Sequence, residues 1–443
     1  MKAPVDLPRP TAPRARTPAT AQGRAASRSL PPAQVLVSDL HGLARLGVDA
    51  TVGITDLVEA VHHSIESRLG VADAASGGRT SGITGFVYRR VRGVTRLVGQ
   101  GLDAVFGVLT ERVLPATAGA SADVAPGDAG VALQREALRS AVNGVWGDHL
   151  AQTGNPLAIP MRLRVGGRPL DLSSPLAGQL PAAPSGRVLL LVHGLCMNDL
   201  QWSRRGHDHG QMLAAELGAT ALYLHYNTGR HVSQNGRELA ALLETLLARW
   251  PVPVQELTLI GHSMGGLVLR SACHIGATSS QAWLGPLRAL VLLGTPHHGA
   301  PLERGGRLLD GALGLSPYVR PFARLGRSRS AGITDLRHGN LQDADWQGRE
   351  RHEQRHDDRQ PTPPPAGVAV YLGAATTASS QNDLRARLLG DGLVPLASAL
   401  GRHDHPALAL PVPPAHQCVV TGAHHWDLLD HPEVAQALRR WMT

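Results

Sequence analysis

The sequence predicts an α/β fold with a doubly wound, mainly parallel sheet, and three observations support this prediction. Apolar runs of strand length recur in residues 160–443. Stretches with helical spacing of apolar residues separate these runs. Within Leu257–Gly266, L-T-L-I-G-H-S-M-G-G, strand character passes through a glycine-bounded serine into helix-compatible sequence. Strands that alternate with helices imply right-handed crossovers, so functional groups should gather at the carboxyl ends of the strands.

The composition indicates one large domain with appendages. The chain has 443 residues, of which 43% are hydrophobic, and it is longer than an ordinary single domain. Its net charge of +8 comes almost wholly from arginine, because Lys2 is the only lysine. No basic stripe interleaved with aromatic residues accompanies this charge, so we expect no nucleic-acid partner. The three cysteines are too few and too far apart for a disulfide framework or a zinc site, and we expect them to be small buried side chains.

Residues 1–34 are predicted to be a disordered tail. They are rich in Pro, Ala, Arg and Ser and lack the apolar core of a signal peptide. No run of about eighteen apolar residues occurs in the chain, so no membrane span is expected. The cytoplasm is therefore the expected location.

Residues 35–150 are predicted to form helices. Val35–Leu69, Thr84–Val113 and Gln134–Leu150 have apolar residues at three- and four-residue intervals. The first two helices would form a hairpin packed on the catalytic domain. Alternatively the second would lie on anionic lipid, because four arginines make its front basic: Arg89, Arg90, Arg92 and Arg96. Peripheral membrane contact through residues 84–113 is thus an open alternative.

Strands and helices are expected to alternate from Pro160 to the C-terminus. The predicted strands are a hairpin, Met161–Val165 with Arg168–Leu172, then Val188–Val192, Ala219–Tyr226, the strand before Gly261, Ala289–Leu293, Gly367–Gly373 and Gln417–Val420. The predicted helices are Gln211–Leu217, Arg237–Trp250, Gly266–Cys273 and Glu433–Trp441.

Ser263 is the candidate nucleophile. A tight strand-to-helix turn holds its central residue in a strained backbone conformation, and glycine on either side avoids a collision of side chains. Such a turn lifts the Ser263 hydroxyl above the sheet edge and directs the amide of Met264 towards the same space. The amide of Leu195, in the loop after Val188–Val192, is the second candidate donor to an oxyanion, and Gly194 would let that backbone approach closely. His193 is expected to be structural, with direct proton transfer as the alternative.

Asp391 and His425 are the candidates for the acid and the base. Asp391 lies in G-D-G-L-V-P, on a turn after the Gly367–Gly373 strand, and Asp383 is its rival. His425 lies in G-A-H-H-W-D-L-L, after the last strand, and His424 is its rival. The chain order serine, acid, histidine is the order of α/β hydrolases.

With these motifs, the chain resembles an α/β-hydrolase serine lipase or esterase, most closely the lipase and GPI inositol-deacylase-like branch. The resemblance covers about residues 160–443 and includes His193-Gly194-Leu195, Gly261–Gly265, Gly294–Pro301, Asp391–Pro395 and His425–Leu429. It implies Ser263 as nucleophile, Asp391 as acid, His425 as base, and Leu195 and Met264 as oxyanion donors. It also implies that His193, Gly194, Pro296 and His297 contact the substrate, with no cofactor and no metal.

Residues 299–366 are predicted to be a lid-like insertion, because they are far longer than a crossover needs. Leu302–Leu325 would form helices, and Arg337–Pro365 would be a solvated segment. Several histidine- and aspartate-rich stretches could suggest a metal, but we expect them to be solvated surface: His352 with His356, Asp357 and Asp358; His207-Asp208-His209; and His403-Asp404-His405.

Three functions remain open at this stage. The first is a carboxylic-ester hydrolase acting on lipids or other hydrophobic acyl substrates. The second is an acyltransferase or thioesterase with the same three residues. The third is a hydrolase-like scaffold that binds a lipid or a partner through the N-terminal helices, although a binding module has no need of Ser263, Asp391 and His425 together. The sequence leaves the oligomeric state undetermined.

Overall fold

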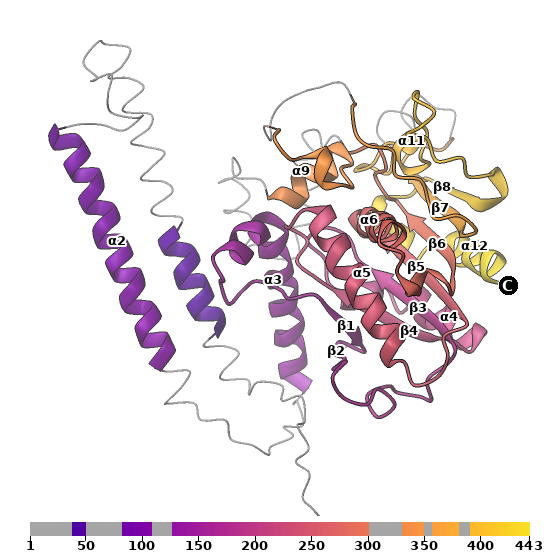
Figure 1. Ribbon diagram of the computed structural model, residues 1–443, viewed down its shortest axis with the longest axis horizontal. Helices are drawn as coiled ribbons and strands as arrows, with labels where there is room; N and C mark the ends of the chain where they lie inside the picture. The colour runs from indigo at the N-terminus through magenta and orange to yellow at the C-terminus, as the bar shows by residue number, and fades with distance from the viewer. Residues whose placement is uncertain (1–37, 50–81, 109–125, 301–329, 350–356, 381–389) are drawn as a thin grey trace, which may run out of the picture.

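A single sheet organises the molecule (Figure 1). The computed structural model describes residues 38–49, 82–108, 126–300, 330–349, 357–380 and 390–443. Over these ranges eight strands pair in the order β2-β1-β4-β3-β5-β6-β7-β8. Strand β1 pairs antiparallel with both β2 and β4. The other neighbouring strands in this order, from β4 through β3 to β8, pair in parallel. This is the doubly wound α/β-hydrolase fold that the sequence predicted.

The strands lie close to their predicted positions. They are β1 (Arg162–Val165), β2 (Arg168–Pro169), β3 (Arg187–Val192), β4 (Thr220–His225), β5 (Glu256–His262), β6 (Leu287–Leu293), β7 (Ala369–Thr376) and β8 (Gln417–Thr421). The α-helices are α2 (Gly82–Val108), α3 (Pro126–Gln152), α4 (His209–Leu217), α5 (Val232–Arg249), α6 (Met264–Thr278), α9 (Ala331–His338), α11 (Leu396–Ala399) and α12 (Pro432–Met442). Residues 38–49 are also helical.

Helices cover both faces of the sheet, which is why its strands are apolar throughout. In β3, Leu190 and Val192 pack in one core with α5 and α6, whereas Leu189 and Leu191 pack in a second core with α4 and α12. Because side chains alternate along a strand, each strand contributes to both cores in turn. The carboxyl ends of the parallel strands consequently share one edge.

The third N-terminal helix belongs to the core that surrounds the sheet. Ala141 and Val145 of α3 lie in the same apolar core as α5 and α6. Backbone oxygens of α3 also accept hydrogen bonds from the core, Gly147 from Asn227 at 2.8 Å and Gly144 from Ser330 at 2.6 Å. The division at residue 150 that we predicted therefore falls inside the packed domain rather than before it, because α3 buries its apolar face there.

The helices predicted in Val35–Leu69 and Thr84–Val113 are present where the structure describes them, at residues 38–49 and in α2. The helix at 38–49 contacts α3 through an Arg135–Asp39 ion pair and contacts α2 through a 2.7 Å hydrogen bond between His41 and Asp103. Residues 1–34, 50–69 and 109–113 lie outside the described residues. Among the helices in the described ranges, none is long and apolar enough to cross a membrane.

Part of the described 299–366 insertion packs in the core of the domain. Ile333 and Leu336 of α9 and Leu341 after it lie in the main core. Residues 302–325, where helices were predicted, lie outside the described residues, and the role of the insertion as a lid stays a prediction. Within the predicted solvated segment Arg337–Pro365, Leu341 is buried, whereas Asp357, Asp358 and Gln360 are exposed as expected.

Candidate active site at the carboxyl edge of the sheet

Ser263 occupies a strained turn between β5 and α6. Its φ of 54° and ψ of −125° lie where a residue with a side chain is seldom found. The flanking glycines are sterically required, because a Cβ on Gly265 would lie 2.2 Å from the Val192 oxygen and one on Gly261 would lie 2.6 Å from the Gly266 nitrogen. The Ser263 amide donates to the Leu293 oxygen at 2.8 Å, which fixes the turn against β6.

Asp391 and His425 meet in a buried hydrogen bond. His425 Nδ1 donates to Asp391 Oδ2 at 2.7 Å, and both side chains are almost fully buried. The other carboxylate oxygen accepts from the amides of Leu393 and Val394 at 2.9 and 2.8 Å. These three donors orient the carboxylate and leave the far nitrogen of His425, Nε2, free to face another group.

Of the two adjacent histidines, only His425 contacts Asp391. His424 is exposed, and its backbone amide donates to Asp427 at 2.9 Å to begin the short 3₁₀ helix His425–Leu429. Asp383, the rival for the acid, lies outside the described residues.

The His425 ring lies beside the Ser263 turn. Gly294, which follows β6, has a φ of 58°, and a Cβ there would lie 2.9 Å from His425 Cε1. The Ser263 amide is bonded to the residue just before Gly294. Glycine at this position thus lets the imidazole approach the end of β6, next to the serine turn.

His262 is a residue of this site that the sequence analysis missed. Its ring centroid lies 4.7 Å from that of His425, and its Nε2 donates to the His425 backbone oxygen at 3.3 Å. Burial, together with the neighbouring His425, keeps the pKa of His262 well below its ordinary value. A neutral His262 therefore supports the loop that carries His425. The sequence feature that could have identified His262 as a site residue is its position directly before Ser263, at the end of β5.

The loop after β3 lies against Ser263. A Cβ on Gly194 would lie 2.9 Å from Ser263 Cβ, so only glycine fits between the loop and the serine. The Met264 amide opens α6 and has no acceptor within its helix. The next loop residue, Cys196, donates its amide to Thr228 Oγ1 at 3.2 Å. The assignment of the Leu195 and Met264 amides as oxyanion donors stays a prediction.

His193 is a buried structural residue, as expected. Its Nδ1 donates to the oxygen of Gly194 at 2.9 Å, and its ring stacks on Tyr226 with centroids 4.6 Å apart. Burial lowers the pKa of His193 to about 4, so the ring is neutral near pH 7. It holds the turn that presents Leu195.

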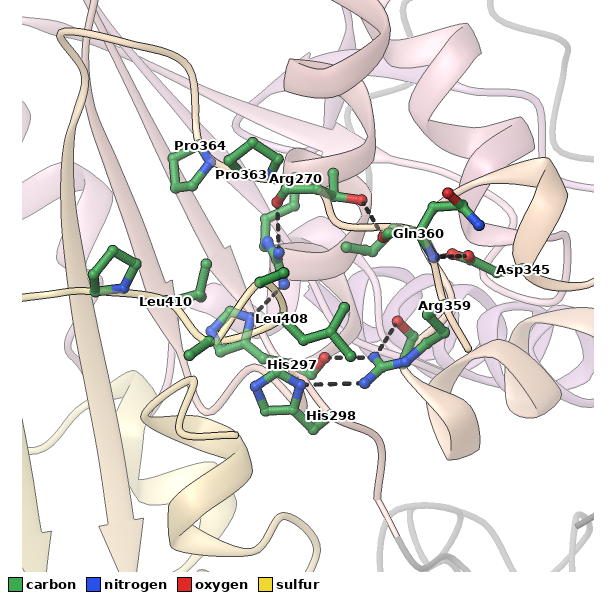
Figure 2. A pocket seen from close by; sticks show the side chains of 16 residues that line it. Arg270, His297, His298, Asp345, Arg359, Gln360, Pro363, Pro364, Leu408 and Leu410 are labelled. Atoms are coloured by element: carbon green, nitrogen blue, oxygen red, sulfur yellow. Dashed lines mark hydrogen bonds between the residues drawn. The ribbon is translucent and has the colours of Figure 1, made fainter. Parts of the chain in front are cut away.

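Pro296 and His297 are buried after β6, but the His297 side chain contacts Arg270. His297 lines a pocket whose wall includes none of Ser263, Asp391 and His425 (Figure 2). The substrate contact implied for His297 stays a prediction.

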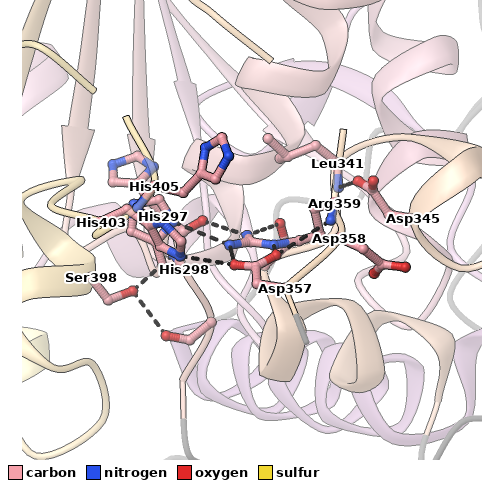
Figure 3. Close-up of polar contacts among 12 residues, drawn as sticks. His297, His298, Leu341, Asp345, Asp357, Asp358, Arg359, Ser398, His403 and His405 are labelled. Carbon is pink, nitrogen blue, oxygen red and sulfur yellow. Dashed lines mark hydrogen bonds and ion pairs between the residues drawn. The ribbon is translucent and has the colours of Figure 1, made fainter. Parts of the chain in front are cut away.

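The histidine- and aspartate-rich stretches are engaged in hydrogen bonds. Within the described ranges no group of three or more His, Cys, Asp or Glu residues could hold a metal ion. His207 Nε2 lies 2.8 Å from His209 Nδ1, and His209 Nε2 donates to the Leu428 oxygen at 3.0 Å. His403 pairs with Asp357 at 3.0 Å (Figure 3). His352 and His356 lie outside the described residues. Of the cysteines, Cys196 and Cys273 are buried, and Cys418 is only partly so.

Comparisons with known proteins give a family model and several solved structures. Residues 170–315 match a family model described as a domain of unknown function, DUF7379. The mature lipase BlEst2 of Bacillus licheniformis is 16% identical, with 59% of this chain and 94% of that chain covered and a TM-score of 0.39. The esterase Pf2001 of Pyrococcus furiosus is also 16% identical, with 58% and 82% covered and a TM-score of 0.33.

EstA from Clostridium botulinum is 14% identical, with 61% of this chain and 92% of that chain covered and a TM-score of 0.35. The comparison with curated proteins found no match. Likenesses this distant carry no argument about activity. The α/β-hydrolase fold is therefore assigned from the strand order of this chain's own sheet.

Proposed function

We propose that this chain is a serine hydrolase that cleaves carboxylic esters of lipids or other hydrophobic acyl groups. The observation that carries the proposal is the buried 2.7 Å hydrogen bond from His425 to Asp391, beside a serine on a strained strand-to-helix turn. If Asp391 were only a solvent-exposed turn residue, we would not expect it to be buried against an imidazole at the sheet edge that carries Ser263. On its motifs we further propose the lipase and inositol-deacylase-like branch.

The reaction proceeds through an acyl-enzyme. His425 takes the Ser263 proton as the hydroxyl oxygen attacks the ester carbonyl, and Asp391 holds the imidazole in the required tautomer. The amides of Leu195 and Met264 donate to the oxyanion of the tetrahedral intermediate. His425 then protonates the leaving alcohol. Water repeats the sequence, which releases the acid and restores Ser263.

Hydrophobic substrates suit the side chains around the serine. Leu195, Met197 and Met264 are buried at this edge. A Cβ on Gly194 would lie 3.3 Å from the Met197 sulfur as well as 2.9 Å from Ser263 Cβ. An acyl chain is favoured in such surroundings because it loses no hydrogen bonds to water on entering.

The test is hydrolysis of p-nitrophenyl esters from acetate to palmitate, with a fluorophosphonate label as a second readout. We expect wild type to be active and labelled, and Ser263→Ala to be neither. Asp391→Asn should lower kcat by about 10⁴ because it favours the wrong tautomer of His425. The chain-length profile separates esterase from lipase, and added alcohol separates hydrolysis from acyl transfer.

His424 and His425 provide a matched pair of variants. His425→Ala should abolish turnover, whereas His424→Ala, next to it and exposed, should retain it. A folded wild type that is neither labelled nor active with any of these esters would refute the proposal. Equal loss in the two histidine variants would refute the assignment of the base.

A further inference from the structure

The pocket that His297 lines is formed by residues from several segments of the chain (Figure 2). It has a volume of about 270 Å³ and is enclosed by α6, the segment after β6, and residues 339–345, 359–364 and 407–411. Ser263, Asp391 and His425 do not line it. A volume near the lower end of ligand pockets, about 300 Å³, suits a small molecule.

Arg270 of α6 places a buried positive charge in the wall of this pocket. The residue is 6% exposed, and its Nη2 donates to the Thr362 oxygen at 2.7 Å. Its Nη1 donates to His297 Nδ1 at 3.2 Å, and its Nε has no partner in the part of the chain that the structure describes. Burial lowers the pKa of Arg270 to about 10, so the side chain remains a cation near pH 7. Both acceptors are neutral groups, and a buried cation without a counter-ion is costly.

His297 adds a second unmatched donor. A guanidinium cannot accept a hydrogen bond, so His297 Nδ1 must be the accepting nitrogen, and in the neutral ring the proton is then on Nε2. That Nε2 is buried and also has no partner in the described ranges. Burial, together with Arg270, holds the pKa of His297 well below its ordinary value, which keeps this tautomer. Two adjacent side chains thus each have an N–H without an acceptor.

The other charged side chains of the pocket wall have several hydrogen-bond partners each. Arg359 forms an ion pair with Asp357 and donates to the oxygens of His297 and Gly339, both at 2.9 Å (Figure 3). Asp345, also in the wall, accepts from the backbone amides of Leu341, Gln342 and Gln360. Of the two arginines in the described wall of the pocket, Arg359 has an ion pair and Arg270 has none. That favours a single negative charge over the two of a phosphate.

One side of the wall is apolar. Leu341 and Leu410 are buried, and Leu408, Pro363, Pro364 and Pro411 complete that side. We propose that this pocket binds a small monocarboxylate with a short apolar chain, its two oxygens held by Arg270 and His297. The proposal does not depend on the catalytic role of Ser263.

The test is binding of sodium butyrate to the full chain, by calorimetry and by the shift of the thermal midpoint. Butyramide, the neutral counterpart, and inorganic phosphate serve as comparison ligands. We expect a saturable response to butyrate alone. A ligand that binds only the folded state raises the midpoint by mass action. Arg270→Gln should weaken binding at least about tenfold, because hydrogen bonds to charged groups contribute more than neutral ones. Arg288→Gln, the same charge change at an exposed arginine of β6, should leave binding unchanged.

Two further variants keep the test decisive. Leu408→Trp fills the pocket without changing a charge and should abolish the response even if Arg270→Gln does not fold. His425→Ala should bind butyrate like wild type. The proposal is overturned if wild type does not respond to butyrate, if butyramide or phosphate binds as well, or if Leu408→Trp responds normally. It also fails if His425→Ala loses a response that Arg270→Gln keeps, because butyrate would then occupy the Ser263 site.

Discussion

At the carboxyl edge of the sheet, the space available at each position determines which residue type fits there. Ser263 is tolerated at a φ of 54° because β5, β6 and α6 hold both sides of its turn. Gly265 and Gly194 are needed where backbones approach closely, whereas Gly178 lies in open space. The same residue type therefore has different importance at different positions, and the backbone atoms around it decide which.

Gly265→Ala should lower the free energy of unfolding by about 1–3 kcal/mol or more, because its Cβ would collide with the Val192 oxygen. It should also abolish esterase activity, since the collision displaces the end of β3 beside the serine. Gly178→Ala, where a Cβ meets nothing within 4 Å, should change stability by less than about 0.5 kcal/mol. Urea unfolding measures both. If the two variants were equally stable, the close approach would be wrong.

At the scale of elements, α2 stands apart from the helices that cover the sheet (Figure 1). It exposes an apolar stripe in which Val94 is 61% and Leu97 68% accessible, and Arg89 and Arg96 are exposed on the same helix. Arg92, predicted as part of the basic front, is instead buried. An exposed helix with apolar and basic residues is typical of contact with anionic lipid.

We therefore predict that the full chain sediments with phosphatidylglycerol–phosphatidylcholine vesicles and that salt weakens this binding. Leu97→Asp should reduce the affinity for vesicles about tenfold or more, since it removes one large apolar side chain from the face that would insert into the lipid. Leu133→Asp, at a leucine of α3 that is 52% accessible, is the matched control and should bind normally. Equal binding by Leu97→Asp and wild type would rule out α2 as the lipid contact.

At the scale of the whole molecule, buried neutral histidines make stability depend on pH. Burial lowers the pKa of His193, His209 and His298 to about 4 each. The pKa values of His225, His262 and His297 are lowered as well, again chiefly by burial. The unfolded chain then binds more protons than the folded one below the ordinary histidine pKa of about 6.5. The stabilisation is present above that pH and is lost as the pH falls towards 4.

The urea midpoint should therefore decrease steadily from pH 7.5 to pH 5. At pH 5.5, each of the three histidines with a pKa near 4 should lower the free energy of unfolding by about 1 kcal/mol. His209→Gln should reduce the number of protons taken up on unfolding by about one, which makes the dependence of stability on pH shallower. His424→Gln, at an exposed site, should not change this dependence. Constant stability across this range would contradict the burial of these rings as neutral groups.

The sequence by itself determined the alternation of strands and helices, the turn at Ser263, and the candidates at the strand ends. These follow from local causes: the apolar pattern of a sheet covered on both faces, and the need for glycine where a turn is tight. The branch of the family, the natural substrate and the catalytic roles are still proposals.

Only the tertiary structure showed that the His425 ring, and not that of His424, contacts Asp391, because the contact joins two loops 34 residues apart. It also brought α3 into the core, set His262 against His425, and turned His297 towards Arg270. Each of these contacts joins segments far apart in the chain. Local propensity says nothing about such contacts, because they are fixed by how whole elements pack.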